Sequence, residues 1–455
     1  MLQFLQERER SAVLRIASIV RNLGGRAWLV GGAVRDALLS SPVKDADLEI
    51  FNLPSHTLHS ALAKEFSLDL VGASFGVFKL HHFAIDVALP RRESKSGSGH
   101  RAFTIEGDPS LSLPSAASRR DFTINAIYLD PLTGELADPF SGRRDLLSRT
   151  LRHVSPKFSE DPLRVLRGMQ LSARFLLSPA PETISICRTM TPENLPPERL
   201  FSEWTKLLLK GIQISRGLSF LRSTSWLRFF PELHRLVSCP QDPQWHPEGD
   251  VWNHTCLCLD RFAATRTGND PEDLIVGLAV LCHDFGKPLC TIFKDGHYRS
   301  PGHDALGRAP TLSFLSRLTN EERILRSVPT LVAAHMQPFQ MFHSHATDSA
   351  VRRLALKVGR IDRLLRVCRA DSEGRAGSWP PPNELSWLAS RAEALRIAAA
   401  APKPIIMGRH LIALGLKPAP QFSTILSQCF SAQLDGAFST LPSALSYLQS
   451  LLHPQ

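Results

Sequence analysis

The periodicity of apolar residues changes once along this 455-residue chain, near residue 150. Before that point, the segments 27–30, 45–51, 76–80 and 83–89 are short and apolar or alternate polar with apolar residues, as half-buried strands do. After about residue 155, apolar residues recur at helical spacing to the end. A chain of this length exceeds one ordinary hydrophobic core. The pattern therefore predicts an α/β head followed by an all-helical body of more than one domain.

Charge and cysteine usage narrow the functional class. A formal net charge of +10 and a pI of about 9.4 favour a polyanionic partner, because basic side chains near phosphates release condensed counterions. The eight cysteines include no CxxC pair, which indicates reduced thiols rather than a cysteine-bound metal. The charged N-terminus and the shortness of the apolar runs predict neither a signal peptide nor a membrane anchor. We expect a soluble, cytoplasmic protein.

Three acidic residues of the head are candidates for a metal site. In KDADLEI, Asp45 and Asp47 are two residues apart, so on a strand their carboxylates project from the same face. Asp86 lies between apolar residues in a later strand-like segment, so it also projects from a buried sheet. Carboxylates this close repel one another unless a cation lies between them, and hard oxygen ligands suit Mg²⁺. The alternative is a solvated strand edge, since Asp-x-Asp is a common pattern.

A glycine pair separates the first strand from the helix that follows it. LVGGAVRD places Gly31 and Gly32 in a turn that exposes backbone N–H groups to an anion at the positive end of a helix. Arg35 and Asp36 follow in the first helical turn, from which the arginine can reach a triphosphate. Glycines alone predict only a tight turn, but a glycine turn followed closely by an Asp-x-Asp pair predicts a nucleotide site.

The segment SEDPLRVLRGMQLSARF predicts a helix with one charged face. Its apolar positions recur at helical spacing, while Glu160, Arg164 and Arg167 share a sector on another face. Arginines on such a face can donate hydrogen bonds to phosphates and base edges. A structural interpretation is also open, because Asp161 before Pro162 is typical of a helix N-cap followed by proline. The pattern alone favours capping.

A second candidate metal site is predicted in the helical part. LAVLCHDFGKP places His283 and Asp284 at the end of an apolar helix, where a buried polar pair is costly without a ligand. Imidazoles and carboxylates suit a transition metal or Mg²⁺ and leave a position for water or substrate. A lone histidine would more often be a core or surface residue. Further candidates lie at wide spacing beside apolar residues: His246, His254, His303, His335 and Asp371.

Five segments together resemble the class II tRNA nucleotidyltransferase and bacterial poly(A) polymerase family, in the family's order: LVGGAVRDALL, KDADLEIF, FAIDVALPR, ASRRDFTINAIYLD and EDPLRVLRGMQLSARF. The resemblance implies a catalytic Mg²⁺ site at Asp45, Asp47 and Asp86. It also implies that the glycine turn and the RRDFTxNA motif hold the incoming nucleotide, and that the EDxxR motif pairs with the base of CTP or ATP. The residues implied in nucleotide binding are Gly31, Gly32, Arg35, Asp36, Arg119, Arg120, Asp121, Asn125, Glu160, Asp161, Arg164 and Arg167.

The helical body resembles a second group of proteins. His254, His283, Asp284 and Asp371 are similar to the H…HD…D pattern of HD phosphohydrolases. The resemblance implies a second divalent metal and the removal of phosphate groups, including 2′,3′-cyclic phosphates, from RNA ends or nucleotides. The alternative is a retained HD fold that binds tRNA without hydrolysis.

We expect four parts: an α/β nucleotidyltransferase head with a mixed or antiparallel sheet (1–150), a helical neck for base recognition and RNA binding (151–235), an HD domain (236–375) and a helical tail that contacts tRNA (376–455). The expected function is template-independent addition of CCA to the 3′ end of tRNA from CTP and ATP. The sequence leaves open an enzyme that adds only A, only C or a poly(A) tail. It also leaves open an HD phosphohydrolase with a vestigial head, and a non-catalytic RNA-binding protein.

Overall fold

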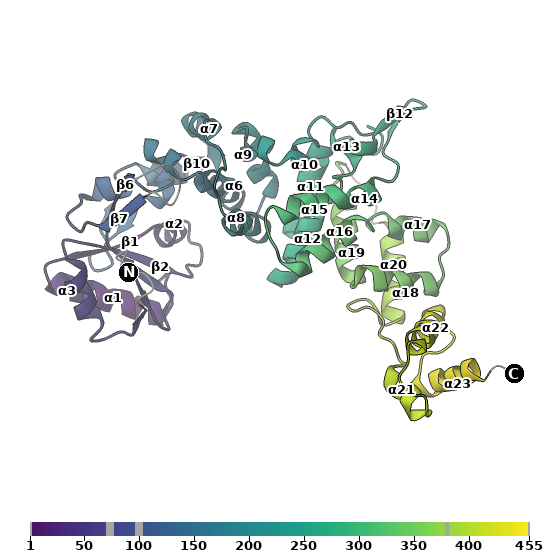
Figure 1. Cartoon of the computed structure of the whole chain (residues 1–455). Coiled ribbons are helices and arrows are strands. Elements are labelled where there is room, and N and C mark those ends of the chain that lie inside the picture. The colour runs from purple at the N-terminus through teal and green to yellow at the C-terminus, as the bar shows by residue number, and fades with distance from the viewer. Residues whose placement is uncertain (1, 70–76, 96–102, 378–381, 454–455) are drawn as a thin grey trace. The chain divides into compact units, whose positions relative to one another are not determined.

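The computed structural model describes residues 2–69, 77–95, 103–377 and 382–453. The chain divides into two compact units, Met1–Gly211 with Arg216–Phe229, and Ile212–Ser215 with Phe230–Gln455. Figure 1 shows the large sheet in the N-terminal unit and mostly helices in the other. The expected domain boundaries near residues 150, 235 and 375 are finer than this division and stay predictions.

A mixed sheet forms the centre of the head, which confirms the expected fold class. In the described residues it has seven strands in the order β3–β4–β5–β2–β1–β8–β9, and only the β2–β5 pair is parallel. A separate antiparallel pair is formed by β6 and β7. The strands are β1 (Arg26–Val30), β2 (Ala46–Phe51), β3 (Leu68–Asp69), β4 (Val77–Leu80), β5 (Ile85–Ala88), β6 (Arg91–Lys95), β7 (Phe103–Gly107), β8 (Tyr128–Leu129) and β9 (Leu136–Ala137).

Alternation along the strands gives the sheet two different faces. Leu29 of β1 belongs to the main core, which is shared with helices α1 (Glu7–Asn22) and α3 (Ser55–Leu62), whereas Trp28 and Val30 join a smaller cluster on the opposite face. Leu48 and Ile50 of β2 also belong to the main core. The acidic residues that alternate with them along β2 therefore project from the second face.

One segment departs from its predicted structure for a local reason. The sequence predicts a strand or a mixed segment at 122–130, but the structure has a 3₁₀ turn at Thr123–Asn125 before the short strand β8. Asp121 Oδ1 accepts hydrogen bonds from the Phe122 N–H at 2.7 Å and from Asn125 Nδ2 at 2.9 Å. Such local side-chain bonds compete with a strand ladder.

Helices complete the N-terminal unit. Helix α6 packs against α8, and its apolar positions Leu163, Leu166, Met169 and Ala173 are buried, as the spacing predicts. Besides the 3₁₀ turn at Thr123–Asn125, the helical elements up to residue 229 are α1 (Glu7–Asn22), α2 (Gly32–Leu38), α3 (Ser55–Leu62), α4 (Leu113–Ala117), α5 (Gly142–Leu147), α6 (Leu163–Phe175), α7 (Pro181–Arg188), α8 (Pro197–Lys210), α9 (Ile214–Ser223), η3 (Pro156–Glu160) and η4 (Trp226–Phe229), with the short strands β10 (Thr150–Leu151) and β11 (Ser178–Pro179).

In its described residues the C-terminal unit is helical apart from one hairpin, β12 (Ile292–Lys294) with β13 (His297–Arg299). Helices α11, α12, α16 and α19 pack against one another, and α21 to α23 enclose a small core of their own. Within the described residues no helix combines the length and apolarity needed to cross a membrane. The helices are α10 (Pro231–His234), α11 (Val251–Ala264), α12 (Asp270–Cys282), α13 (Lys287–Cys290), α14 (His303–Leu306), α15 (Arg308–Ser316), α16 (Glu322–Val332), α17 (Gln337–His343), α18 (Asp348–Val358), α19 (Ile361–Glu373), α20 (Asn383–Ala394), α21 (Gly408–Ala413), α22 (Gln421–Asp435) and α23 (Leu441–Leu452).

Candidate active sites

Two of the three predicted carboxylates of the head, those of Asp47 and Asp86, meet on the second face of the sheet. Asp47 of β2 is the register partner of Asp86 of β5, and both line a cleft of about 350 Å³. Asp45 precedes β2 by one residue and does not line this cleft. Burial raises the pKa of Asp47, and the carboxylates of Asp86 and Asp45 raise it further, while Arg120 opposes them. Hard oxygen donors that repel one another fit a divalent cation.

The glycine turn lies directly beside these carboxylates. Gly31 has φ +71°, and a Cβ atom there would lie 3.3 Å from Arg120 Nη1 and 3.4 Å from Asp47 Oδ2. Only glycine combines that backbone conformation with so close an approach. Gly32 begins helix α2. The structure therefore brings the turn, Arg120 and Asp47 together.

Arg120 is held in place by residues that the sequence interpretation misses. Its Nη2 donates to Glu49 Oε2 at 3.2 Å and its Nε to Tyr128 Oη at 3.4 Å. Glu49 lies two residues after Asp47 on the same strand face. The alternation that identifies the aspartates therefore also predicts that the Glu49 side chain projects toward this site. Arg119 and Arg91 line the same cleft. The cleft thus combines carboxylates with arginines that can face phosphate oxygens.

A hydrogen-bonded chain joins the glycine-turn helix to the neck. Arg35 Nη1 donates to Asn125 Oδ1 at 2.6 Å, and Arg35 Nε donates to Asp36 at 2.8 Å. Asn125 donates to Asp121, whose other oxygen accepts from Arg167 Nε at 2.7 Å. Arg35 is buried and its guanidinium also covers the ring of Phe175. Its predicted contact with a triphosphate would require some of these bonds to be exchanged.

The EDxxR motif is engaged within the chain. Asp161 Oδ1 accepts from the Leu163 N–H at 3.0 Å, as in a cap at the start of α6, and its Oδ2 pairs with Arg199 at 3.0 Å. Arg164 donates to the carbonyl oxygens of Lys157 at 2.7 Å and Arg119 at 2.8 Å. The capping interpretation thus describes this structure, and the base-pairing role of the motif stays a prediction.

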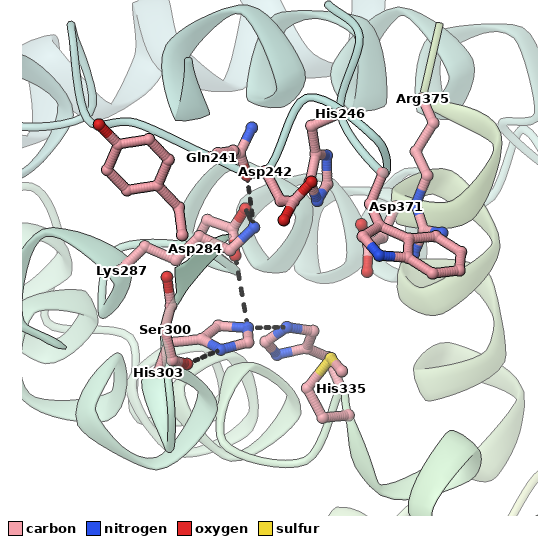
Figure 2. A pocket seen from close by; sticks show the side chains of 13 residues that line it. Gln241, Asp242, His246, Asp284, Lys287, Ser300, His303, His335, Asp371 and Arg375 are labelled. Atoms are coloured by element: carbon pink, nitrogen blue, oxygen red, sulfur yellow. Dashed lines mark hydrogen bonds and ion pairs between the residues drawn. The ribbon is translucent and has the colours of Figure 1, made fainter. Parts of the chain in front are cut away.

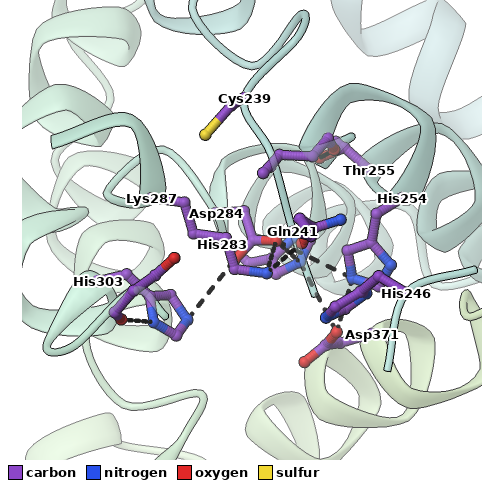
Figure 3. Close-up of polar contacts among 12 residues, drawn as sticks. Cys239, Gln241, His246, His254, Thr255, His283, Asp284, Lys287, His303 and Asp371 are labelled. Carbon is purple, nitrogen blue, oxygen red and sulfur yellow. Dashed lines mark hydrogen bonds and ion pairs between the residues drawn. The ribbon is translucent and has the colours of Figure 1, made fainter. Parts of the chain in front are cut away.

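The second candidate site gathers residues from three helices. His254 lies on α11, His283 and Asp284 follow the last residue of α12, and Asp371 lies on α19. His254 Nε2 is 2.9 Å from Asp371 Oδ1 and 4.0 Å from Asp284 Oδ2. His283 Nε2 is 3.2 Å from Asp284 Oδ2 and 3.8 Å from Asp371 Oδ1. These four residues, which we call the HD cluster, are buried and lie together, as Figure 3 shows.

Three histidines of this region hold Nδ1 in the same way. In each, Nδ1 contacts a backbone carbonyl oxygen, which can only accept a hydrogen bond. Nδ1 therefore carries a proton, and Nε2 is the nitrogen that a metal would bind when the ring is neutral, as in many metal sites. The three distances are 2.8 Å from His283 to Val280, 2.9 Å from His303 to Ser300 and 2.7 Å from His335 to Val332.

Asp284 lies between two groups of donor atoms. On one side are the other members of the HD cluster. On the other side, its Oδ1 is 3.6 Å from His303 Nε2, which is 3.2 Å from His335 Nε2. Figure 2 shows Asp284, His303 and His335 around one pocket. Burial and the neighbouring imidazoles of His283 and His303 lower the pKa of His335 to about 4, so it stays neutral and able to bind a metal.

Three buried polar atoms of this site lack a well-aligned hydrogen bond within the described part of the chain. Among the described residues, neither His283 Nε2 nor either carboxylate oxygen of Asp284 has a hydrogen-bond partner of good geometry, although Lys287 Nζ lies 2.8 Å from Asp284 Oδ2. Burial alone would raise the pKa of Asp284, but the charges of His283 and Lys287 hold it well below its usual value. An ionised carboxylate and an open imidazole nitrogen, both buried, fit a divalent cation.

Two further side chains at this site escape the sequence interpretation. Glu248 Oε1 accepts from Nδ1 of His254 at 2.8 Å and of His246 at 2.9 Å, so it turns His254 Nε2 toward Asp371. Cys258 Sγ lies 3.3 Å from His254 Nε2 and adds a fourth donor atom to that side. Glu248 lies in a loop without periodicity, whereas Cys258 follows His254 by one helical turn, which is a usable signal.

Known proteins that are similar to this chain show both its class and its family. Residues 27–152 match the Poly A polymerase head domain, so the head is that of a nucleotidyltransferase. The multifunctional CCA protein of Xanthomonas oryzae pv. oryzae is 36% identical over 431 residues, covering 91% of this chain and 99% of the relative. The corresponding protein of Xylella fastidiosa (strain M23) is 37% identical over 367 residues, covering 77% and 85%. The chain belongs to the family of multifunctional CCA proteins.

Solved structures share the fold along the whole chain. The Bacillus stearothermophilus CCA-adding enzyme in complex with CTP is 22% identical with a TM-score of 0.64, covering 98% of both chains. The Thermotoga maritima CCA-adding enzyme complexed with tRNA is 16% identical with a TM-score of 0.61, covering 99% of this chain and 97% of the other.

Proposed function

We propose that this protein is a template-independent nucleotidyltransferase that adds CCA to the 3′ end of tRNA from CTP and ATP. Membership of the multifunctional CCA protein family supports the reaction. The observation that carries the assignment to the head is the pairing of Asp47 with Asp86 on one sheet face, next to the Gly31 turn. We assign Mg²⁺ to these carboxylates together with Asp45, tRNA, CTP and ATP as substrates, and the cytoplasm as the location.

The transfer needs no covalent enzyme intermediate. The 3′ hydroxyl of the tRNA loses its proton to solvent, its oxygen forms a bond to the α-phosphorus, the bond from that phosphorus to the bridging oxygen breaks, and pyrophosphate leaves with the electron pair. Mg²⁺ bound at the carboxylates would neutralise charge on the attacking and leaving oxygens. Arg120, fixed by Glu49 and Tyr128, directs Nη1 toward the glycine turn, where it can hold the triphosphate.

We assign reading of the base to the neck. Asp161 offers acceptors and Arg164 offers donors, so together they can imitate the edge of a complementary base. In this assignment Asp161 leaves Arg199, and Arg164 leaves the carbonyl of Lys157, when a nucleotide enters. Loss of discrimination between CTP and ATP in Arg164→Ala, with incorporation retained, is the expected result.

The decisive experiment supplies tRNAs that lack one, two or all three terminal nucleotides, together with CTP, ATP and Mg²⁺. Sequencing of the products is expected to show completed CCA ends from every substrate. Products that stop after C, gain only A or carry a long A tail would show that the enzyme catalyses one of these other reactions instead of CCA addition. Absence of pyrophosphate release would indicate a non-catalytic RNA-binding protein.

We propose a second activity, the hydrolysis of phosphate esters at the HD cluster. The observation that favours it is that His283 Nε2 and the Asp284 carboxylate oxygens are buried without a hydrogen bond of good geometry among the described residues, and that Asp284 lines a pocket of about 280 Å³. A divalent cation held there by the HD cluster would supply Lewis-acid activation of water. Glu248 orients His254, and Lys287 lies beside Asp284, where it can also contact a phosphate oxygen.

The HD activity has its own test. His283→Ala is expected to abolish release of phosphate from 2′-AMP and to lower the divalent metal content of the purified chain, while CCA addition continues. Equal phosphate release by His283→Ala and wild type would mean that the HD cluster does not catalyse hydrolysis. The helical body would then be a retained HD fold without this activity. Loss of CCA addition in His283→Ala would contradict the assignment of that reaction to the head.

A further inference from the structure

Two exposed aromatic residues line the pocket beside the HD cluster. Trp245 and Tyr298 are 51% and 37% exposed, and both belong to the wall that also includes Asp284 and Asp371. Their position in this wall places both side chains where a ligand in the pocket would meet them.

One residue contacts both of the segments that carry these rings. Asp242 Oδ2 is 2.6 Å from His297 Nδ1 of strand β13, next to Tyr298. The Asp242 carbonyl oxygen accepts from the Trp245 N–H at 3.1 Å. Asp242 therefore ties the hairpin that carries Tyr298 to the turn that carries Trp245. On the hairpin, the ring of Tyr298 packs on Phe293 with centroids 4.9 Å apart. The two backbone segments that carry Trp245 and Tyr298 are thus joined to each other within the chain.

Cationic groups lie in the same pocket. Lys287 Nζ is 2.8 Å from Asp284 and 2.7 Å from Gln241 Oε1, and Arg375 lines the wall as well. The buried Nε of Arg375 has no hydrogen-bond partner among the residues that the structure describes. Figure 2 shows Lys287 and Arg375 with the polar side chains of this pocket. A guanidinium with an open donor suits an anion, and a phosphate in particular.

We propose that Trp245 and Tyr298 form a nucleobase subsite of the phosphohydrolase. The inference rests on the proposed HD activity. Aromatic rings alone would accept any flat apolar group, and Arg375 with Lys287 alone would accept any phosphate. A ligand that joins both is a nucleotide, or the terminal nucleotide of an RNA, with its base against the rings and its phosphate near the HD cluster. Stacking tolerates every base, because each has a π face.

The first test compares two phosphate esters of a secondary alcohol, 2′-AMP and glycerol 2-phosphate, of which only 2′-AMP carries a ribose and a base. For the wild-type chain we expect kcat/KM for 2′-AMP to exceed that for glycerol 2-phosphate. Trp245→Ala is expected to reduce this ratio on the order of tenfold, and Trp245→Phe to restore most of it. Ile292→Ala is the matched control, because Ile292 is an exposed apolar residue of the same hairpin outside the pocket wall, and its ratio should equal that of the wild type.

The second test measures binding without turnover. The emission that disappears in Trp245→Phe belongs to Trp245, so the difference between the two proteins reports on that ring alone. In full-length protein treated with EDTA, 2′-AMP is expected to quench this difference signal and glycerol 2-phosphate to leave it unchanged.

The outcomes separate the inference from the activity on which it rests. If wild type hydrolyses both esters but Trp245→Ala keeps the wild-type ratio, the subsite is wrong and the phosphohydrolase stands. If wild type hydrolyses neither ester, the proposed activity fails. Quenching by 2′-AMP would then still support a nucleobase site, and its absence would overturn both.

Discussion

At the scale of the residue, Gly31 shows how tightly the proposed nucleotide site is packed. Its positive φ excludes most side chains, and the space beside it is filled by Arg120 and Asp47. Gly24 also has a positive φ, of 81°, but nothing lies within 4 Å of a Cβ atom placed there. The two glycines therefore share the backbone requirement and differ only in what a side chain would meet.

Gly31→Ala and Gly24→Ala are expected to behave differently. Each should lower the free energy of unfolding by about 1–3 kcal/mol, because alanine is strained at these φ values. Only Gly31→Ala should also lose nucleotide incorporation, since its methyl group would displace Arg120 or Asp47. Urea unfolding and an incorporation assay on both variants test this. Equal incorporation by the two proteins would show that the close approach at Gly31 is unimportant.

Asp121 predicts a dependence of stability on pH. Burial alone would raise its pKa, but Arg167, Asn125 and the Phe122 N–H lower it from 3.8 to about 2. Because the pKa is depressed in the folded chain, the ionised group stabilises the fold above about pH 4, and this contribution disappears as the pH falls through 2. The difference corresponds to roughly 2 kcal/mol.

Asp121→Asn should therefore be less stable than wild type by roughly that amount at neutral pH, with the gap narrowing below about pH 4. Denaturation curves of the two proteins at a series of pH values measure it. When Arg167→Gln is present in both proteins, the difference between their free energies of unfolding should be smaller in the same pH range. The reason is that this substitution removes the charge that lowers the pKa of Asp121. A gap that is constant with pH would mean that Asp121 stabilises the fold through shape rather than charge.

At the scale of the element, helix α6 is fixed by crowding around a glycine. A Cβ atom on Gly168 would lie 2.7 Å from Phe220 Cζ and 3.1 Å from Phe122 Cζ. Alanine is normally better than glycine inside a helix by about 1 kcal/mol. Overpacking of a rigid core costs about 1–3 kcal/mol, which outweighs that gain. The element that carries Arg164 and Arg167 is thus held against the RRDFTxNA segment through Phe122.

Gly168→Ala is accordingly expected to lower the midpoint of thermal unfolding despite the better helix propensity of alanine. The double variant Gly168→Ala with Phe220→Leu removes the nearest ring and should recover part of the loss. A single variant as stable as the wild type would show that α6 moves away at little cost.

The same elements show what a sequence can predict. Alternation along 45–51 places Asp47 on a polar face, and the apolar run before His283 predicts its burial; both follow from local periodicity and are confirmed. The 3₁₀ turn at Thr123–Asn125 depends instead on the side-chain bonds of Asp121, which periodicity does not contain. Glu248 reaches His254 only through tertiary packing of an irregular loop.

At the scale of the whole molecule, the net charge of +10 predicts the character of tRNA binding. Neutralised phosphates release counterions, so the logarithm of affinity should fall linearly with the logarithm of salt concentration. We expect the Kd for tRNA to rise at least about tenfold between roughly 50 and 200 mM KCl. Filter binding across that range measures the slope. An affinity independent of salt would require recognition without phosphate contacts.

The central claim is that the carboxylates on the second face of the head sheet drive nucleotide addition. CTP incorporation into tRNA lacking its terminal nucleotides, measured for Asp47→Ala against Glu65→Gln, tests it most directly. Glu65 is a carboxylate of the same head, ion-paired with Arg15 and absent from the walls of the cleft. We predict a loss of at least about 100-fold in Asp47→Ala and unchanged incorporation in Glu65→Gln, with both proteins folded. Incorporation by folded Asp47→Ala at the wild-type rate would contradict the account.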